Sequence, residues 1–149
     1  MNQPPTKASP EIFLRTIRIL WGSFLVCVGL FVLVTRLTRP ADLPAAAAGG
    51  SDPLLYVLGV LALVVVAASF FLKGILYRRG AEQQQPLLVQ AGFILAMALC
   101  EAGVLMGLVG IFVTRNDTYY LLFALGALGM LLHFPRRAQV EAAYYKGLR

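Results

Sequence analysis

Four long apolar runs dominate the pattern of hydrophobic and polar positions along this chain. They cover residues 17–35, 53–76, 87–113 and 118–134, and less apolar segments separate them, the longest of which is a predicted loop at 36–52. Apolar runs of this length are typical of membrane-spanning helices, which need about 20 residues to cross a hydrocarbon core of about 30 Å. The pattern therefore predicts an all-α integral membrane protein, folded as a four-helix bundle in a single domain.

The polar segments between the runs contain residues that end and begin helices. Gly80 is placed to end the second helix and Pro86 to open the third, because glycine commonly follows a helix and proline suits its first turn. The linkers YRRGAEQQQP and TRND are short, so the helices that they join should be antiparallel neighbours. Residues 1–11 and 138–149 are predicted to be tails. The second tail is either a basic helix on the membrane surface or a solvated segment without regular structure.

The basic residues predict how the chain is oriented. The 149 residues include 13 Lys and Arg and carry a net charge of +6. With four spans, one side holds Lys7, Arg15, Arg18, Lys73, Arg78, Arg79, Arg136, Arg137, Lys146 and Arg149, and the other holds only Arg36, Arg39 and Arg115. This bias predicts that both termini are cytoplasmic in a cell inner (plasma) membrane. The expected partner of these charges is a lipid bilayer with anionic headgroups, not nucleic acid.

Small residues follow one face of the third apolar run. They recur at spacings of three and four, with a GxxxG step among them: Gly92, Ala96, Cys100, Gly103, Gly107 and Gly110. A smooth helix face of this kind lets two helix backbones approach closely. It serves either packing inside the bundle or contact with a membrane protein partner, which includes a second copy of the chain in a homo-oligomer.

The same run has one charged residue, Glu101, close to its centre. A charge at the bilayer midplane is costly, so Glu101 should face a polar group or water, or stay protonated. Four polar residues lie between it and the predicted cytoplasmic side, namely Ser23, Ser69, Gln90 and His133. One hypothesis is that these residues line a half-pathway through which Glu101 exchanges protons or binds a cation. The alternative is that Glu101 is a protonated residue that only links helices by hydrogen bonds.

The sequence contains no pattern that is typical of a catalytic or cofactor site. The single histidine, His133, lies well away from the midplane, so no nucleophile–histidine–acid set is expected. No glycine-rich phosphate loop and no metal-ligand spacing occurs in the sequence. Cys27 and Cys100 are predicted to be small packing residues inside the first and third helices. We therefore expect a protein that is not an enzyme and uses no metal or cofactor.

One stretch resembles a known family. FILAMALCEAGVLMGLVGIF, preceded by QQQP, is similar to the ion-carrying second helix of the proteolipid c subunit of rotary ATP synthases. The resemblance covers residues 83–112, and it implies that Glu101 carries a proton or a sodium ion. The second helix lacks the family's glycine repeat, and two further spans flank the hairpin. The segment LLHFPRR also resembles four-span bacterial membrane proteins of no assigned function.

Two functions therefore follow as hypotheses from the sequence. The first is a small multi-pass membrane protein that acts as an accessory or assembly partner without catalytic activity. The second is a c-subunit-like membrane protein that handles protons or cations through Glu101. They differ in whether the carboxyl group of Glu101 ionises in the native protein.

Overall fold

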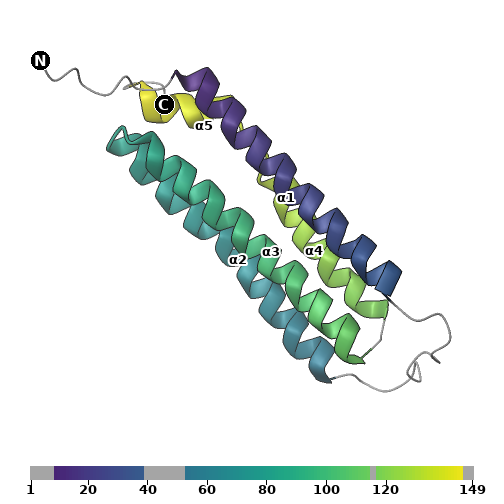
Figure 1. The fold of residues 1–149 in the computed structure, drawn as a ribbon. Helices are drawn as coiled ribbons and strands as arrows, with labels where there is room; N and C mark the ends of the chain where they lie inside the picture. Colours follow the sequence, from purple (N-terminus) through teal and green to yellow (C-terminus); the bar gives the residue numbers. More distant parts are fainter. Residues whose placement is uncertain (1–8, 39–52, 115–116, 146–149) are drawn as a thin grey trace, which may run out of the picture.

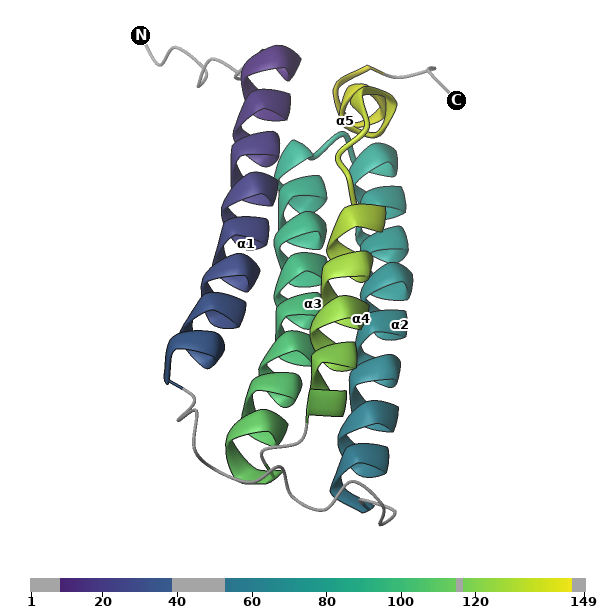
Figure 2. The same ribbon diagram turned by 90° about the vertical axis from the view of Figure 1, so that its right-hand side faces the viewer.

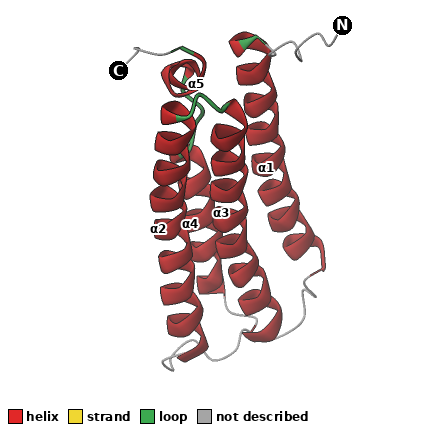
Figure 3. Cartoon of the chain, turned by 90° about the vertical axis from the view of Figure 1, so that its left-hand side faces the viewer, coloured by secondary structure: helices red, strands yellow, loops and turns green. Residues whose placement is uncertain are grey.

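Residues 9–38, 53–114 and 117–145 are described by the computed structural model, and within them the chain is helical without any strand. The helices are α1 (Pro10–Thr38), α2 (Pro53–Glu82), α3 (Pro86–Thr114), the short 3-10 helix η1 (Asp117–Tyr119), α4 (Tyr120–Leu132) and α5 (Arg137–Tyr144). The long helices run side by side, and α5 lies across one end of them (Figures 1 and 3). The prediction of an all-α fold is confirmed.

Three of the described helices, α1, α2 and α3, are each long and apolar enough to cross a membrane. They contain 29, 30 and 29 residues, or about 44 Å each, which exceeds the hydrocarbon thickness of about 30 Å. The segment Asp117–Leu132 reaches a fourth candidate span only together with α5, from which it is bent by 51°. The predicted fourth run, 118–134, thus contains a helix that stops at Leu132. The cause is Pro135, which disfavours helical geometry at the residue before it.

The first helix begins earlier than its apolar run because a serine caps it. The Oγ atom of Ser9 accepts a hydrogen bond from the main-chain N–H of Ile12 at 3.4 Å, so it satisfies one of the unpaired donors of the first turn. Pro10 takes the first helical position, where its missing N–H costs nothing. The first seven residues of α1 therefore extend the predicted span 17–35 toward the N-terminus.

The turn between α2 and α3 differs from the prediction at Gly80. Helix α2 continues through Gly80 to Glu82, and the chain reverses at Gln84, which has a positive φ of 51°. Gly80 has another role, because a Cβ atom there would lie 2.9 Å from the Cγ2 atom of Val89 in α3. The glycine therefore permits close packing of the hairpin and does not end the helix, whereas Pro86 opens α3 as predicted.

Helix α3 lies at the centre of the packing. Eleven of its 29 residues are buried, compared with four of 29 in α1. All six residues of the predicted small-residue face are among the buried ones. Gly92 and Gly103 pack against α2, and Gly107 and Gly110 pack against α4 and η1. In this structure the small-residue face is therefore covered by other helices of the same chain.

Helix α1 packs against the other helices through apolar residues, among them the buried Leu14, Ile17 and Val28, and polar contacts add to this packing. The indole N–H of Trp21 donates to the carbonyl oxygen of Met130 in α4 at 2.9 Å. Toward the other end of α1, the hydroxyl of Tyr120 donates to Thr35 at 3.3 Å. Figure 2 shows α1 beside α3 and α4, with its first turns close to α5. Helix α1 thus contributes to the interior of the fold, although it has fewer buried residues than α3.

The predicted C-terminal tail contains a packed helix. Within the residues described, the segment after Pro135 forms α5, whose Val140 and Ala143 are buried. The ring of Tyr144 packs edge-on against Phe13 of α1, with ring centroids 5.9 Å apart. Part of the predicted loop 36–52 and the basic residues Lys7, Arg39, Arg115, Lys146 and Arg149 lie outside the described residues.

Candidate functional site

Two neighbouring residues of α3, Cys100 and Glu101, form polar contacts with different helices. Successive residues of an α-helix point about 100° apart. Cys100 therefore faces α2 and α4 and is fully buried, whereas Glu101 is half-buried and contacts α1. The middle of α3 thus presents polar groups on two different sides, one toward α2 and α4 and one toward α1.

The buried side is a central polar cluster, which consists of Ser69 and Lys73 of α2, Cys100 of α3 and His133 at the end of α4. The Nε2 atom of His133 lies 2.8 Å from the Oγ atom of Ser69, and the Sγ atom of Cys100 lies 3.6 Å from the same oxygen. The Nζ atom of Lys73 lies 3.5 Å from Nδ1 of His133 and donates to its carbonyl oxygen at 3.3 Å. Exposure of these side chains is low, at 0% for Ser69, 8% for Lys73 and 1% for His133.

The hydrogen bonds of this cluster fix one consistent arrangement of donors. The ammonium group of Lys73 can only donate, so Nδ1 of His133 accepts and its Nε2 atom carries the proton. That N–H then donates to Ser69, whose own hydroxyl donates to the carbonyl of Val66 at 2.6 Å. The chain of donors runs from Lys73 through His133 and Ser69 to the main chain of α2. A neutral histidine held in this way links α2 to the end of α4.

Sequence spacing explains why this cluster forms. Ser69 and Lys73 are four residues apart and therefore share one face of α2. The aromatic ring of Phe70 covers the imidazole of His133, with centroids 4.1 Å apart. His133 caps the end of α4, where its main-chain N–H donates to the carbonyl oxygens of Gly129 and Met130. Its side chain turns back toward α2 at the level where the chain leaves the helix.

The other side of α3 carries the contact between Glu101 and Cys27. The thiol of Cys27 in α1 donates to the Oε1 atom of Glu101 at 3.2 Å. A thiol is a weak donor, so it compensates an ionised carboxylate poorly. Among the described residues, Glu101 forms no ion pair. The carboxyl group therefore lies between α1 and α3 with the thiol of Cys27 as its hydrogen-bond partner.

The structure brings together only some of the predicted ion-binding residues. Ser69 and His133 meet in the central polar cluster, but Glu101 contacts Cys27 instead of either of them. Ser23 is exposed on α1 and donates to the carbonyl of Ile19 in its own helix at 3.0 Å. Gln90 is half-buried, eleven residues before Glu101 in α3, which is about 16 Å along the helix. These residues do not form one continuous hydrogen-bonded path in this conformation.

Sequence reasoning missed two residues of these contacts. The charge pattern predicts only a topology-setting role for Lys73, although its position one turn after Ser69 places it on the same face of α2. Cys27 was interpreted as a packing residue, and no sequence pattern links it to Glu101. The helical spacing could have identified Lys73, whereas the Cys27 contact depends on how α1 is rotated against α3.

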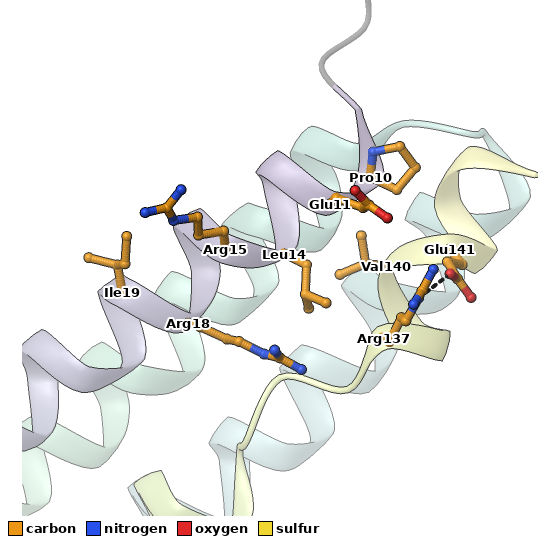
Figure 4. A pocket seen from close by; sticks show the side chains of 9 residues that line it. All are labelled: Pro10, Glu11, Leu14, Arg15, Arg18, Ile19, Arg137, Val140 and Glu141. Carbon is orange, nitrogen blue, oxygen red and sulfur yellow. Dashed lines mark hydrogen bonds and ion pairs between the residues drawn. The ribbon is translucent and has the colours of Figure 1, made fainter.

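Two surface grooves flank α5 at the end where the basic residues gather. One lies between α1 and α5 and has a volume of about 500 Å³; its charged residues surround Leu14 and Val140 (Figure 4). In it Arg137 pairs with Glu141 at 2.6 Å. The other groove lies between α2, the end of α4 and α5, has a volume of about 560 Å³, and reaches the central polar cluster through Lys73 and His133.

The arrangement offers hydrogen bonding and charge, and it does not gather metal ligands. Among the described residues, no group of three His, Cys, Asp or Glu side chains could hold a metal ion. Both cysteines are free thiols. No protein-family model, curated protein or solved structure matches the chain.

Proposed function

We propose that the protein is a small multi-pass membrane protein that acts as an accessory or assembly partner without catalytic activity. In this proposal α1, α2 and α3 cross the membrane, and η1, α4 and α5 form a bent fourth span whose last part lies at the surface. Both termini are cytoplasmic, in the inner (plasma) membrane. Each long helix has the length and apolarity that this placement needs.

The distribution of charge along the bundle supports this orientation. The start of α1, the turn between α2 and α3, and α5 lie at the same end (Figure 2). That end carries a described set of basic residues, namely Arg15, Arg18, Arg78, Arg79, Arg136 and Arg137. At the opposite end the described residues include one arginine, Arg36, which stacks on the ring of Tyr120. Such a bias is typical of a cytoplasmic end.

The observation that carries the accessory role is the close packing around Cys100. A Cβ atom on Gly129 of α4 would lie 2.9 Å from the Sγ atom of Cys100 and 3.0 Å from Cγ1 of Val66. One on Gly126 would lie 2.8 Å from the carbonyl oxygen of Cys100. With α2, α3 and α4 this close together, and with Ser69 and His133 bonded to each other, the interior has little room for a substrate. The apolar outer faces are left for lipid and for other membrane proteins.

Site-specific photocrosslinking tests the accessory role. A photoreactive amino acid is placed at exposed positions of α1 (Val26, Leu33) and α2 (Val57, Val64), with the buried Ile111 of α3 as the matched control. In native membranes we expect one helix face to give a discrete protein adduct, identified by mass spectrometry, while the buried control gives none. A homodimer adduct would identify the partner as a second copy. Lipid adducts alone at all four exposed positions would refute the accessory role.

The second candidate function is proton or cation handling by Glu101, and one specific observation favours it. Its carboxyl group is half-buried near the middle of α3, and its bonding partner is the weak donor Cys27. The resemblance of residues 83–112 to the ion-carrying c-subunit helix supports the same role. In this proposal Glu101 takes up a proton or a cation when α1 moves away from α3.

Carbodiimide labelling tests whether Glu101 is protonated in native membranes, and infrared titration then distinguishes proton exchange from a purely structural role. The reagent modifies protonated carboxyl groups in apolar surroundings, so it should label Glu101 in native membranes, and Glu101→Gln should abolish the adduct. Glu11→Gln, which changes an exposed carboxyl at the start of α1, is the control. Infrared carbonyl bands should then show Glu101 ionising as the pH is raised. A carboxyl band that stays unchanged throughout the titration would refute proton exchange.

A further inference from the structure

The groove between α2, the end of α4 and α5 has an unusual charge. The described residues that line it include Lys73, His133, Arg136 and Gln139, and none of these described residues is Asp or Glu. The groove on the other side of α5 is also basic, with Arg15, Arg18 and Arg137, but Glu11 and Glu141 neutralise part of that charge (Figure 4). Only the first groove, which we call the cationic groove, therefore presents positive charge without a carboxylate in its wall.

Lys73 is the most constrained cation of the cationic groove. Its side chain is only 8% exposed, and among the described residues no carboxylate pairs with it. Of its three N–H donors, two have partners on His133, the Nδ1 atom and the carbonyl oxygen. The rings of Tyr77 and Phe93 have their centroids 5.1 and 5.8 Å from Nζ. These cation–π contacts stabilise the buried ammonium less than a carboxylate would. One N–H thus remains for an anion, and a buried ammonium gains most from such a partner.

Two further groups complete the polar wall of the cationic groove. Arg136 is exposed and precedes α5, so its guanidinium can bind a phosphate with two parallel hydrogen bonds. The Oε1 atom of Gln139 is buried and has no hydrogen-bond partner among the described residues. Because this oxygen has almost no accessible surface, the wall presents a ligand with the donors of Lys73 and Arg136 and not with this acceptor.

The cationic groove also has an apolar wall beside its polar one. Phe70, Leu132 and Phe134 line the same groove, and they are 41%, 64% and 44% exposed. In the proposed membrane placement they face acyl chains, while Lys73 extends toward the headgroups from an apolar helix face. A soluble anion would use only the polar wall, whereas a phospholipid would contact both walls.

We propose that the cationic groove binds the headgroup of an anionic phospholipid such as phosphatidylglycerol. The phosphate accepts hydrogen bonds from Lys73 and Arg136. The acyl chains lie along Phe70 and Phe134. This inference rests on the membrane placement of the proposed function, but it is independent of the accessory role and of Glu101.

Native mass spectrometry of the full-length protein in neutral detergent tests the proposal. Phosphatidylglycerol and phosphatidylcholine with identical acyl chains are titrated separately. The test variants are Arg136→Gln and Lys73→Gln, and Arg79→Gln is the matched control because Arg79 is an exposed arginine at the same end outside the groove. We expect selective binding of phosphatidylglycerol and a loss of about tenfold in affinity for Arg136→Gln, from a charged hydrogen bond. The control should change affinity by no more than about twofold.

Several outcomes would overturn the proposal. Equal binding of both lipids would remove the role of charge, and equal losses in Arg136→Gln and Arg79→Gln would show attraction to the surface alone. Displacement of the lipid by inorganic phosphate would identify a soluble anion as the ligand. Arg136→Gln is decisive even where Lys73→Gln fails to fold, because Arg136 lies at the surface. Release of the protein from membranes by alkaline carbonate would instead refute the membrane placement.

Discussion

Gly126 of α4 provides a direct test of how closely α3 and α4 pack. A Cβ atom at this position would lie 2.8 Å from the carbonyl oxygen of Cys100 and 3.2 Å from the main-chain nitrogen of Val104, and it would overlap the Val104 side chain. Because two of these atoms belong to the α3 backbone, rotation of a side chain cannot relieve the overlap. Gly126→Ala therefore has to push the two helices apart.

The expected loss of stability can be worked from two opposing effects. Alanine is favoured over glycine inside a helix by about 1 kcal/mol, and overpacking costs about 1–3 kcal/mol. With backbone atoms in the way, the cost should be near the upper value, so Gly126→Ala should lower the free energy of unfolding by about 2 kcal/mol. The control is Gly29→Ala in α1, where a Cβ atom meets nothing within 4 Å. It should raise the free energy by up to about 1 kcal/mol.

Unfolding in SDS, followed by tryptophan fluorescence, measures both changes. Trp21 is the only tryptophan in the chain, and its indole donates to the carbonyl of Met130 in α4. Its emission therefore reports when α1 separates from α4, while circular dichroism reports the loss of helix. If Gly126→Ala is as stable as Gly29→Ala, the close approach of α3 and α4 is wrong.

Three further predictions test the polar contacts. His133→Leu removes a partner of Ser69 and should lower the free energy of unfolding in SDS by about 2 kcal/mol; an unchanged value would contradict the central polar cluster. Trp21→Phe loses one hydrogen bond and should lower the free energy of unfolding by about 1 kcal/mol, measured by circular dichroism. An unchanged free energy would argue against the α1–α4 contact. In mild detergent, a maleimide should label half-buried Cys27 faster than Cys100, which is 0% exposed; equal rates in single-cysteine variants would contradict this difference.

Much of the fold could be predicted from the pattern of apolar residues alone. The first three apolar runs lie within α1, α2 and α3, because a continuous apolar stretch has no alternative way to satisfy its backbone in a membrane. The start of α3 at Pro86 followed from proline chemistry. The helix boundary at Gly80 was wrong, since the turn depends on the backbone of Gln84 and on the packing of Val89.

The candidate site was predicted less completely, because its contacts join residues far apart in the chain. Ser69 and His133 were both identified as polar residues within apolar runs, and the structure joins them directly. Lys73 was missed as a member of the same cluster. Periodicity within one helix shows which residues share a face, but it does not show which face of another helix they meet.

The sequence by itself therefore determined the class of the elements, their approximate lengths, and the one face of α3 that permits close approach. These properties depend on local composition and on the helical repeat. The tertiary structure alone decided that Cys100 faces α2 and α4 while Glu101 faces Cys27. It also brought Lys73 and Arg136 into one groove. The physical reason is that the rotation of each helix about its own axis follows from the packing of all its neighbours together.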